Sequence, residues 1–198
     1  MNIALPETEL PIRIRLDRPM TDEELFRFCA ENEQVRVERD ANGELIVMSP
    51  SGLEGSGRNS EIIADLTIWA RLDGRGKVFD SNGGFTLPDG SMRAPDAAWV
   101  SFARWNALAR EEQKRFARVT PEFLIELRSE SDRLPDLEAK MRAWVMNGVE
   151  VAWLVDPLRK VVAIYRAGEP AEVLEDPSSV QGSGPVAGFE LVMARIWQ

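Results

Sequence analysis

Residues 121–155 read PEFLIELRSESDRLPDLEAKMRAWVMNGVEVAWLV and contain two apolar runs separated by an amphipathic segment. The runs 123–127 and 151–155 have the length and the aromatic or β-branched content of buried strands. Between them, the apolar residues of 135–147 recur at helical spacing, and Gly148 supplies a C-terminal cap. The segment therefore predicts a strand, a helix and a second strand.

The rest of the chain extends this pattern in both directions. Thr21 and Glu24 form a capping box that opens a helix ending near residue 31, and the turn sequence at 40–43 predicts a hairpin. A Gly-rich loop leads into a helix over 59–72. The remaining expected elements are strands over 77–81, 84–87, 97–100 and 161–165, extended segments over 171–174 and 189–197, and a charged helical excursion over 102–118.

Strands alternate with helices along most of the chain, which predicts an α/β (α+β) fold with a mixed central sheet flanked by helices. An N-terminal helix and hairpin precede this sheet. Residues 1–18 are expected to form an N-terminal arm with an edge strand at 11–16, and residues 19–198 a single domain.

The composition excludes several chemistries. The 198 residues include no histidine, so a Ser-His-Asp or Cys-His nucleophile and a histidine-ligated zinc site are excluded. Cys29 is the only cysteine, so the chain can form no internal disulfide, which suits a reducing compartment. Its position on the apolar side of a helix predicts that it lies in the core. No apolar run approaches the ~20 residues of a membrane span, so we expect a cytoplasmic protein with no membrane partner. The net charge of -9 disfavours a protein that binds nucleic acid through its overall charge. It is compatible with a local site in which acidic side chains hold a metal ion beside a phosphate.

Three residues could carry chemistry, and each also has a structural interpretation. Glu126 interrupts the run FLIEL, where a buried carboxylate needs a cation, either an arginine or a metal ion. Asp96 follows Pro95 at the start of the run 97–100, where it could cap a turn or bind a ligand. Lys140 lies beside the apolar stripe of its helix, so its ammonium either reaches solvent or points to the site of Glu126.

The same three residues are more informative as a set. Two carboxylates on strands can bind Mg²⁺ or Mn²⁺, because these hard cations prefer oxygen ligands. A nearby lysine can orient or help deprotonate the attacking water and stabilise negative charge on a phosphorane. Asp96, Glu126 and Lys140 therefore predict phosphodiester hydrolysis without histidine.

The order of motifs in the second half of the chain resembles that of a known family. The motifs are Pro95-Asp96, ELRSES at 126–131, DLEAK at 136–140, NGV at 147–149 and AWLVDP at 152–157. From about residue 18 to the C-terminus, the chain resembles the Uma-two family of restriction-endonuclease-like proteins. The resemblance implies a PD-(D/E)XK nuclease core, in which helices flank a mixed central sheet and the active site lies at its open edge.

The resemblance also implies roles for individual residues. Asp96 and Glu126 would be the two metal-binding acids, and the backbone carbonyl of Leu127 could add a further metal contact. The usual lysine place, two residues beyond the second acid, holds Arg128, whose guanidinium does not readily serve as a base. The family commonly uses a lysine of the following helix instead, and that residue is Lys140.

A second departure from the family pattern lies near residue 60. Many relatives have a histidine where this chain has Asn59. Asn59 could point into the site or serve as the N-cap of its helix. Glu61 is a further acid, but the helical period places it away from the apolar stripe, so we expect an exposed residue.

These observations predict an endonuclease that depends on Mg²⁺ or Mn²⁺ and acts on DNA, and homodimerisation is compatible with such a core. One alternative is a non-catalytic binding or regulatory protein on the same scaffold, with Glu126 paired to Arg128 or Arg133. Another is a hydrolase of small phosphorylated substrates, suggested by the negative net charge. The segment 103–118 has five basic residues against two acidic ones, and it is either a solvated face or the candidate for phosphate contact.

Overall fold

The computed structural model describes residues 11–48 and 51–198, and its strands form two main sheets. Sheet A has the strand order β1-β3-β2-β6-β5, and sheet B the order β11-β10-β9-β8-β7-β4. The strands of sheet A are β1 (Ile12–Ile14), β2 (Arg36–Arg39), β3 (Leu45–Met48), β5 (Phe85–Thr86) and β6 (Met92–Arg93). Those of sheet B are β4 (Gly76–Asp80), β7 (Ala97–Ser101), β8 (Phe123–Leu127), β9 (Val151–Asp156), β10 (Val161–Arg166) and β11 (Glu172–Glu175).

The predicted strand, helix and strand over 121–155 are confirmed as β8, α4 (Leu134–Met146) and β9. β8 and β9 are parallel neighbours, and α4 connects them across one face of sheet B. All other strand pairs in sheet B are antiparallel, so the sheet is mixed as predicted. This α+β arrangement with flanking helices is the expected fold class.

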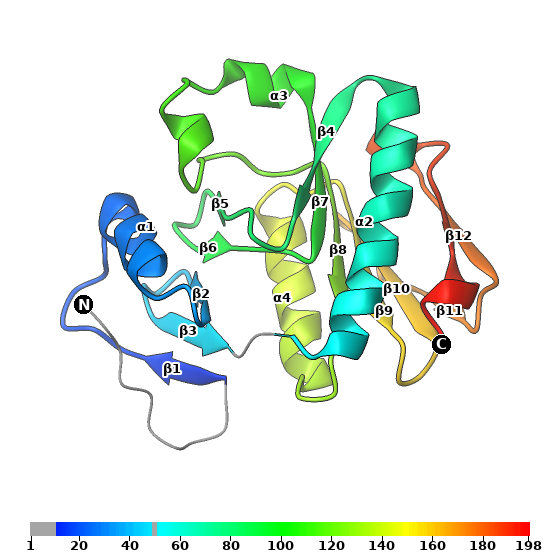
Figure 1. Cartoon of the computed structure of the whole chain (residues 1–198), viewed down its shortest axis with the longest axis horizontal. Helices are drawn as coiled ribbons and strands as arrows, with labels where there is room; N and C mark the ends of the chain where they lie inside the picture. Colours follow the sequence, from blue (N-terminus) through cyan, green and yellow to red (C-terminus); the bar gives the residue numbers. More distant parts are fainter. Residues whose placement is uncertain (1–10, 49–50) are drawn as a thin grey trace.

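Helices cover both faces of sheet B, as Figure 1 shows. On one face, Ile62 and Leu66 of α2 (Leu53–Asp73) pack with Trp153 and the C-terminal segment. On the other face, Met141 and Trp144 of α4 are fully buried. Burial of such large apolar side chains is the main stabilisation of a sheet between two helical layers.

Sheet A forms a smaller layer covered by α1 (Asp22–Glu31). The predicted capping box is present, because the Thr21 side chain accepts from the backbone of Glu24 and the Glu24 side chain accepts from the backbone of Thr21. The predicted hairpin is also present as β2 and β3, and its turn ends at Gly43 with a φ of 83°. Cys29 is half-buried at the edge of this layer and not in its core.

Two helix predictions were wrong. α2 begins at Leu53 and not near residue 59, because the helix is anchored on sheet B through Ile62 and Leu66, and its first turns also contain a Glu54–Arg58 ion pair. The excursion 102–118 is helical only in α3 (Phe102–Ala107) and a short 3₁₀ helix (Glu112–Lys114). Gln113 donates to the carbonyls of Trp105 and Leu108, which satisfies the end of α3 and stops it.

The C-terminal segment is less extended than predicted. It contains β12 (Ser179–Gln181) and β13 (Glu190–Val192), with 3₁₀ helices at Gly184–Val186 and Met193–Arg195. Of the predicted N-terminal arm, residues 1–10 lie outside the described residues, and the edge strand is present as β1. Among the described residues, no helix has an apolar stretch of the length that crossing a bilayer requires.

Candidate active site

Glu126 is a carboxylate on the central strand of sheet B and is only 4% exposed. Its Oε1 atom lies 2.8 Å from Lys140 Nζ and accepts a hydrogen bond of 2.8 Å from Trp144 Nε1. Lys140 and Trp144 are one helical turn apart on α4, so both reach the same point of β8. The sequence prediction that Glu126 needs a cation is therefore met by Lys140.

Asp96 lies immediately before β7, which is antiparallel to β8. The register pairs Ala97 with Ile125, so the next cross-strand pair is Asp96 and Glu126, and both side chains lie on the face covered by α4. The backbone N–H of Leu127 donates to Asp96 Oδ2 at 2.8 Å. Arg36 NH1 lies 3.6 Å from Asp96 Oδ1, a longer ion pair that leaves this oxygen less constrained.

Glu38 is a site residue that the sequence analysis missed. It lies on β2 of sheet A, and its Oε1 atom is 2.9 Å from Lys140 Nζ and 3.2 Å from the backbone N–H of Ala94. Arg93 NH1 lies 3.6 Å from Glu38 Oε2. The sequence offers no local signal for this residue, because Glu38 follows the polar side of an alternating hairpin strand. Its burial depends on the contact of sheet A with α4.

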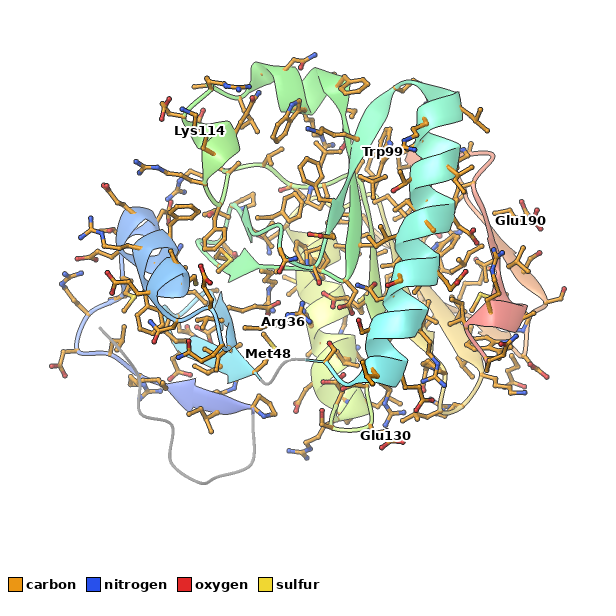
Figure 2. The ribbon with its side chains drawn as sticks, in the orientation of Figure 1. Arg36, Met48, Trp99, Lys114, Glu130 and Glu190 are labelled. Carbon is orange, nitrogen blue, oxygen red and sulfur yellow. The ribbon has the colours of Figure 1, made fainter. Side chains whose placement is uncertain are left out.

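These contacts bring four charged residues from different parts of the chain together: Glu38, Asp96, Glu126 and Lys140. Lys140 bridges the two glutamates, and Asp96 is held by the strand that carries Glu126. Arg36 projects from sheet A in the region where that sheet meets α4 (Figure 2). Sheet A, sheet B and α4 thus meet at a compact charged cluster, which we define by Glu38, Asp96, Glu126 and Lys140.

The environment of the cluster shifts the pKa values of all four residues. Burial, together with the neighbouring Asp96 and Glu38, raises the pKa of Glu126 to about 7, although Lys140 opposes the shift. Burial also raises the pKa of Asp96, against the effects of Arg36 and the Leu127 N–H. For Glu38, burial is outweighed by Lys140 and Arg93, so its pKa lies below the ordinary value.

Lys140 is held in its charged form. Burial favours the neutral amine, but the two glutamates outweigh this effect and raise the pKa of Lys140 above its ordinary value. Its ammonium is therefore a fixed positive charge at neutral pH. A residue in that state can orient a water or stabilise an anion, but it does not accept a proton.

The carboxylate oxygens of Asp96 and Glu126 suit a hard divalent cation. Both hydrogen-bond donors of Glu126 use Oε1, so Oε2 is the oxygen left for a cation, and Asp96 offers Oδ1 in the same way. Among the described residues, no group of three or more histidine, cysteine or acidic side chains is arranged to hold a metal ion. A cation here would have two protein carboxylates and keep water or substrate oxygens, as Mg²⁺ commonly does.

Arg128 does not belong to this cluster. Its NH1 atom donates to Asp156 Oδ2 at 2.8 Å, so the residue in the usual lysine place connects the ends of β8 and β9 and is paired with Asp156, not with Glu126. Arg133 is the N-cap residue of α4 and makes no ion pair with the described residues. The alternative in which Arg128 or Arg133 neutralises Glu126 is therefore wrong.

The two residues of α2 singled out in the sequence lie elsewhere. Asn59 lies well inside the helix and cannot be its N-cap, which is Gly52. Its Oδ1 atom is buried and accepts no hydrogen bond from the described residues. Glu61 is half-exposed and pairs with Arg195 at 3.2 Å, in keeping with the expected surface position.

The basic excursion 103–118 is mostly neutralised by ion pairs. Arg104 contacts Glu122 and Glu150, each at 3.1 Å. The other pairs are Lys114–Glu111, Arg115–Glu23 and Arg118–Asp22. These ion pairs connect the segment to α1 and to the residues that precede β8 and β9. They favour a structural role for its basic side chains over contact with phosphate.

Solved structures were compared with the fold of this chain. A solved structure described as a putative nuclease belonging to DUF820 from Anabaena variabilis ATCC 29413 superimposes with a TM-score of 0.73 at 19% identity, covering 90% of this chain and 98% of the other. A second match, to the DrdV–DNA complex, has a TM-score of 0.38 at 14% identity and covers 62% of this chain but 12% of the other.

No curated protein matches the chain. The first of these likenesses shows that the fold is shared with a nuclease-like structure. A family model described as "Putative restriction endonuclease" matches residues 22–194, which is most of the chain. The chain therefore belongs to the Uma2 family.

Proposed function

We propose that this protein is an endonuclease that hydrolyses phosphodiester bonds in DNA with the help of Mg²⁺ or Mn²⁺. The family description supports a nuclease activity of the restriction-endonuclease type. The observation that carries the proposal is the convergence of Glu126 and Lys140 at 2.8 Å, with Asp96 held in the adjacent register position. Two carboxylates and one ammonium are sufficient for this chemistry in a chain without histidine.

Asp96 and Glu126 would hold the divalent cation. When bound, such a cation supplies Lewis-acid activation of the phosphate and a lower pKa for an attacking water. The hydrogen bond from Leu127 to Asp96 and that from Trp144 to Glu126 fix the two carboxylates before any ligand arrives. This preorganisation lowers the cost of assembling the charged site during the reaction.

Lys140 would act through its charge. Because its pKa is raised by two glutamates, it remains an ammonium and can donate hydrogen bonds to an attacking water or to a phosphate oxygen. Glu38 keeps it in place from the side of sheet A. In this proposal Glu38 is a positioning residue. Lys140 does not act as a base, because it already carries a proton.

Cleavage of supercoiled plasmid DNA in Mg²⁺ or Mn²⁺ tests the proposal. The parent should convert the plasmid to nicked or linear forms, and the variants Asp96→Asn, Glu126→Gln and Lys140→Met should each lose this activity while remaining folded. Matched controls are Glu169→Gln and Lys114→Met, which change an exposed acid and an exposed lysine outside the cluster. Parent protein that cuts no DNA would contradict the assignment.

The charged cluster is also compatible with the alternative of a non-catalytic protein on a nuclease scaffold. Lys140 pairs with both glutamates, so the two acids have a cation even without a metal ion. Calorimetric titration with Mn²⁺ separates the two cases. Binding that is lost in Asp96→Asn supports the nuclease, whereas no binding by the parent, with no cleavage, supports a scaffold that has lost the reaction. Cleavage of small phosphate esters alone would support the hydrolase alternative.

A further inference from the structure

The outward face of α2 exposes large apolar side chains that nothing in the described chain covers. Leu53 is 95% exposed, Ile68 58% and Leu72 85%. α2 is drawn without obstruction along its whole length in Figure 1, in front of sheet B. Three such side chains on a single helix are unusual for the surface of a monomer and are typical of an interaction surface.

Beyond Leu53, the N-terminal half of the same face carries mostly small side chains. Ser56, Gly57 and Ser60 occupy this side of the first two turns, and Ala64 lies near the middle of the helix. A Cβ atom added at Gly57 would meet nothing within 4 Å, so the packing of this chain does not require glycine there. Glycine destabilises a helix relative to alanine. The small surface is therefore better explained by close approach of another molecule.

A groove of about 500 Å³ runs along this part of α2. One wall is formed by Ser56, Ser60 and Thr67, and the other by Asp80 and Ser81 at the end of β4. The groove thus widens the outward face of α2 into a concave surface. A two-fold rotation places the protruding apolar side chains of one copy against the concave, small-residue surface of a second copy. The surface is therefore complementary to itself.

We propose that the outward face of α2 is the interface of a two-fold symmetric homodimer, in which the α2 helices of two copies pack antiparallel with Ala64 at the centre. In this arrangement, Ile68 of each copy lies against the turn that contains Gly57 and Ser60 in the other. Leu72 lies near the first turn of the other helix. Large residues of one half are then placed against small residues of the other half.

The charges on α2 support a second copy as the occupant. Glu54 lies in the first turn, where it pairs with Arg58 of its own chain but stays 69% exposed, and Arg71 lies in the last turn. An antiparallel pair therefore brings the exposed carboxylate of Glu54 in each copy near Arg71 of the other. Arg71 makes no ion pair with the described residues of its own chain. Glu61 and Asp65 on the same side of α2 are paired with Arg195, and Asp80 lines the groove, so the surface has no excess of positive charge to attract a nucleic acid.

Cysteine cross-linking tests the position of the two-fold axis. Cys29 is first replaced by serine, so that no native thiol remains. Ala64→Cys in this background should form an intermolecular disulfide on mild oxidation, because residues at a two-fold axis bring their Cα atoms within disulfide reach. Leu158→Cys, at an exposed apolar position in the turn between β9 and β10, should stay monomeric on a non-reducing gel. Equal cross-linking at both positions, or none at residue 64, would overturn the proposal.

The molar mass in solution provides the second test. Sedimentation or light scattering should give twice the chain mass of 22.2 kDa for the parent. Ile68→Asp should reduce it to the mass of one chain, while Leu158→Asp, which changes a side chain of similar exposure, should leave the dimer intact. Thermal melting verifies that both variants are folded. A monomeric parent, or a dimer that survives Ile68→Asp, would show that α2 is not the interface.

Discussion

Lys140 Nζ lies 2.9 Å from Glu38 Oε1, and this ion pair connects α4 on sheet B with β2 of sheet A. The same ammonium is 2.8 Å from Glu126. One side chain therefore neutralises two buried acids that are far apart in the sequence. The relationship makes sheet A part of the candidate site and not only a neighbouring layer.

Glu38→Gln should destabilise the fold by about 1–3 kcal/mol, because the amide keeps the acceptor for Ala94 but removes the charge that faces Lys140 and Arg93. Urea denaturation measures this change. Glu111→Gln is a matched control, since it breaks an exposed pair with Lys114 and should cost under ~0.5 kcal/mol. Equal midpoints for the two variants would show that Glu38 is not held by the cluster.

Lys140→Arg and Lys140→Met distinguish a fixed positive charge from a proton acceptor. If the charge is what matters, arginine should retain measurable DNA cleavage, and methionine should reduce the rate by about 10²-fold or more. Methionine also removes the only ammonium shared by Glu38 and Glu126 among the described residues and leaves Glu38 with Arg93 at 3.6 Å. Plasmid cleavage with the folded variants gives the answer, and equal loss of activity in both would argue that the ammonium has a role beyond its charge.

Arg36→Ala should weaken substrate binding more than the chemical step. Arg36 is 30% exposed, compared with 16% for Lys140, and its contact with Asp96 is long at 3.6 Å. It is therefore the cation best placed to meet a phosphate. KM should rise with kcat largely kept, and the salt dependence of DNA affinity should lose a slope of about 1. Arg13→Ala, which removes an exposed arginine paired with Asp40, should change neither quantity.

Arg128→Met should affect stability but not cleavage. The guanidinium joins β8 to β9 through the buried Asp156, so its removal leaves that carboxylate with backbone donors but without its cation. We expect a loss of about 1–3 kcal/mol in the free energy of unfolding, with kcat unchanged. A loss of cleavage in a folded Arg128→Met protein would contradict this prediction and show that Arg128 takes part in the reaction.

The sequence predicted the parts of the site that have local signals. Glu126 interrupts an apolar strand, and Lys140 lies at the edge of an apolar helical stripe, so the need for a cation and its source could both be inferred. Asp96 could be placed because the strand that follows it is apolar. Its position beside Glu126 comes from the antiparallel register of β7 and β8, which the sequence alone does not define.

Other features depend on contacts that have no local pattern. Glu38 reads as the polar side of a hairpin strand, and its burial results from the contact with α4. The first turns of α2 read as a loop because Gly52, Gly55 and Gly57 are poor helix formers. The helix nevertheless forms there, because it continues a long segment that is anchored on sheet B through Ile62 and Leu66. Tertiary packing outweighs local propensity in both cases.

The raised pKa of Glu126 makes stability depend on pH in a defined direction. The carboxyl has an ordinary pKa of 4.5, and burial raises it to about 7 in the folded protein. A carboxyl with a raised folded pKa stabilises the folded state fully below the unfolded value, and this stabilisation is lost as the pH rises through the folded value. Between pH 4.5 and 7, Glu126 should therefore reduce the free energy of unfolding by up to about 3 kcal/mol.

Urea denaturation of the metal-free protein at several pH values measures this effect when the parent is compared with Glu126→Gln. The amide keeps an acceptor for Trp144 but does not titrate, so the difference in stability between the two proteins should move in favour of the variant as the pH rises to about 7 and then level off. Glu38, whose pKa is lowered, contributes in the opposite direction and is common to both proteins. A difference that does not change over this range would mean that Glu126 ionises near its ordinary pKa and that Lys140 compensates its burial fully.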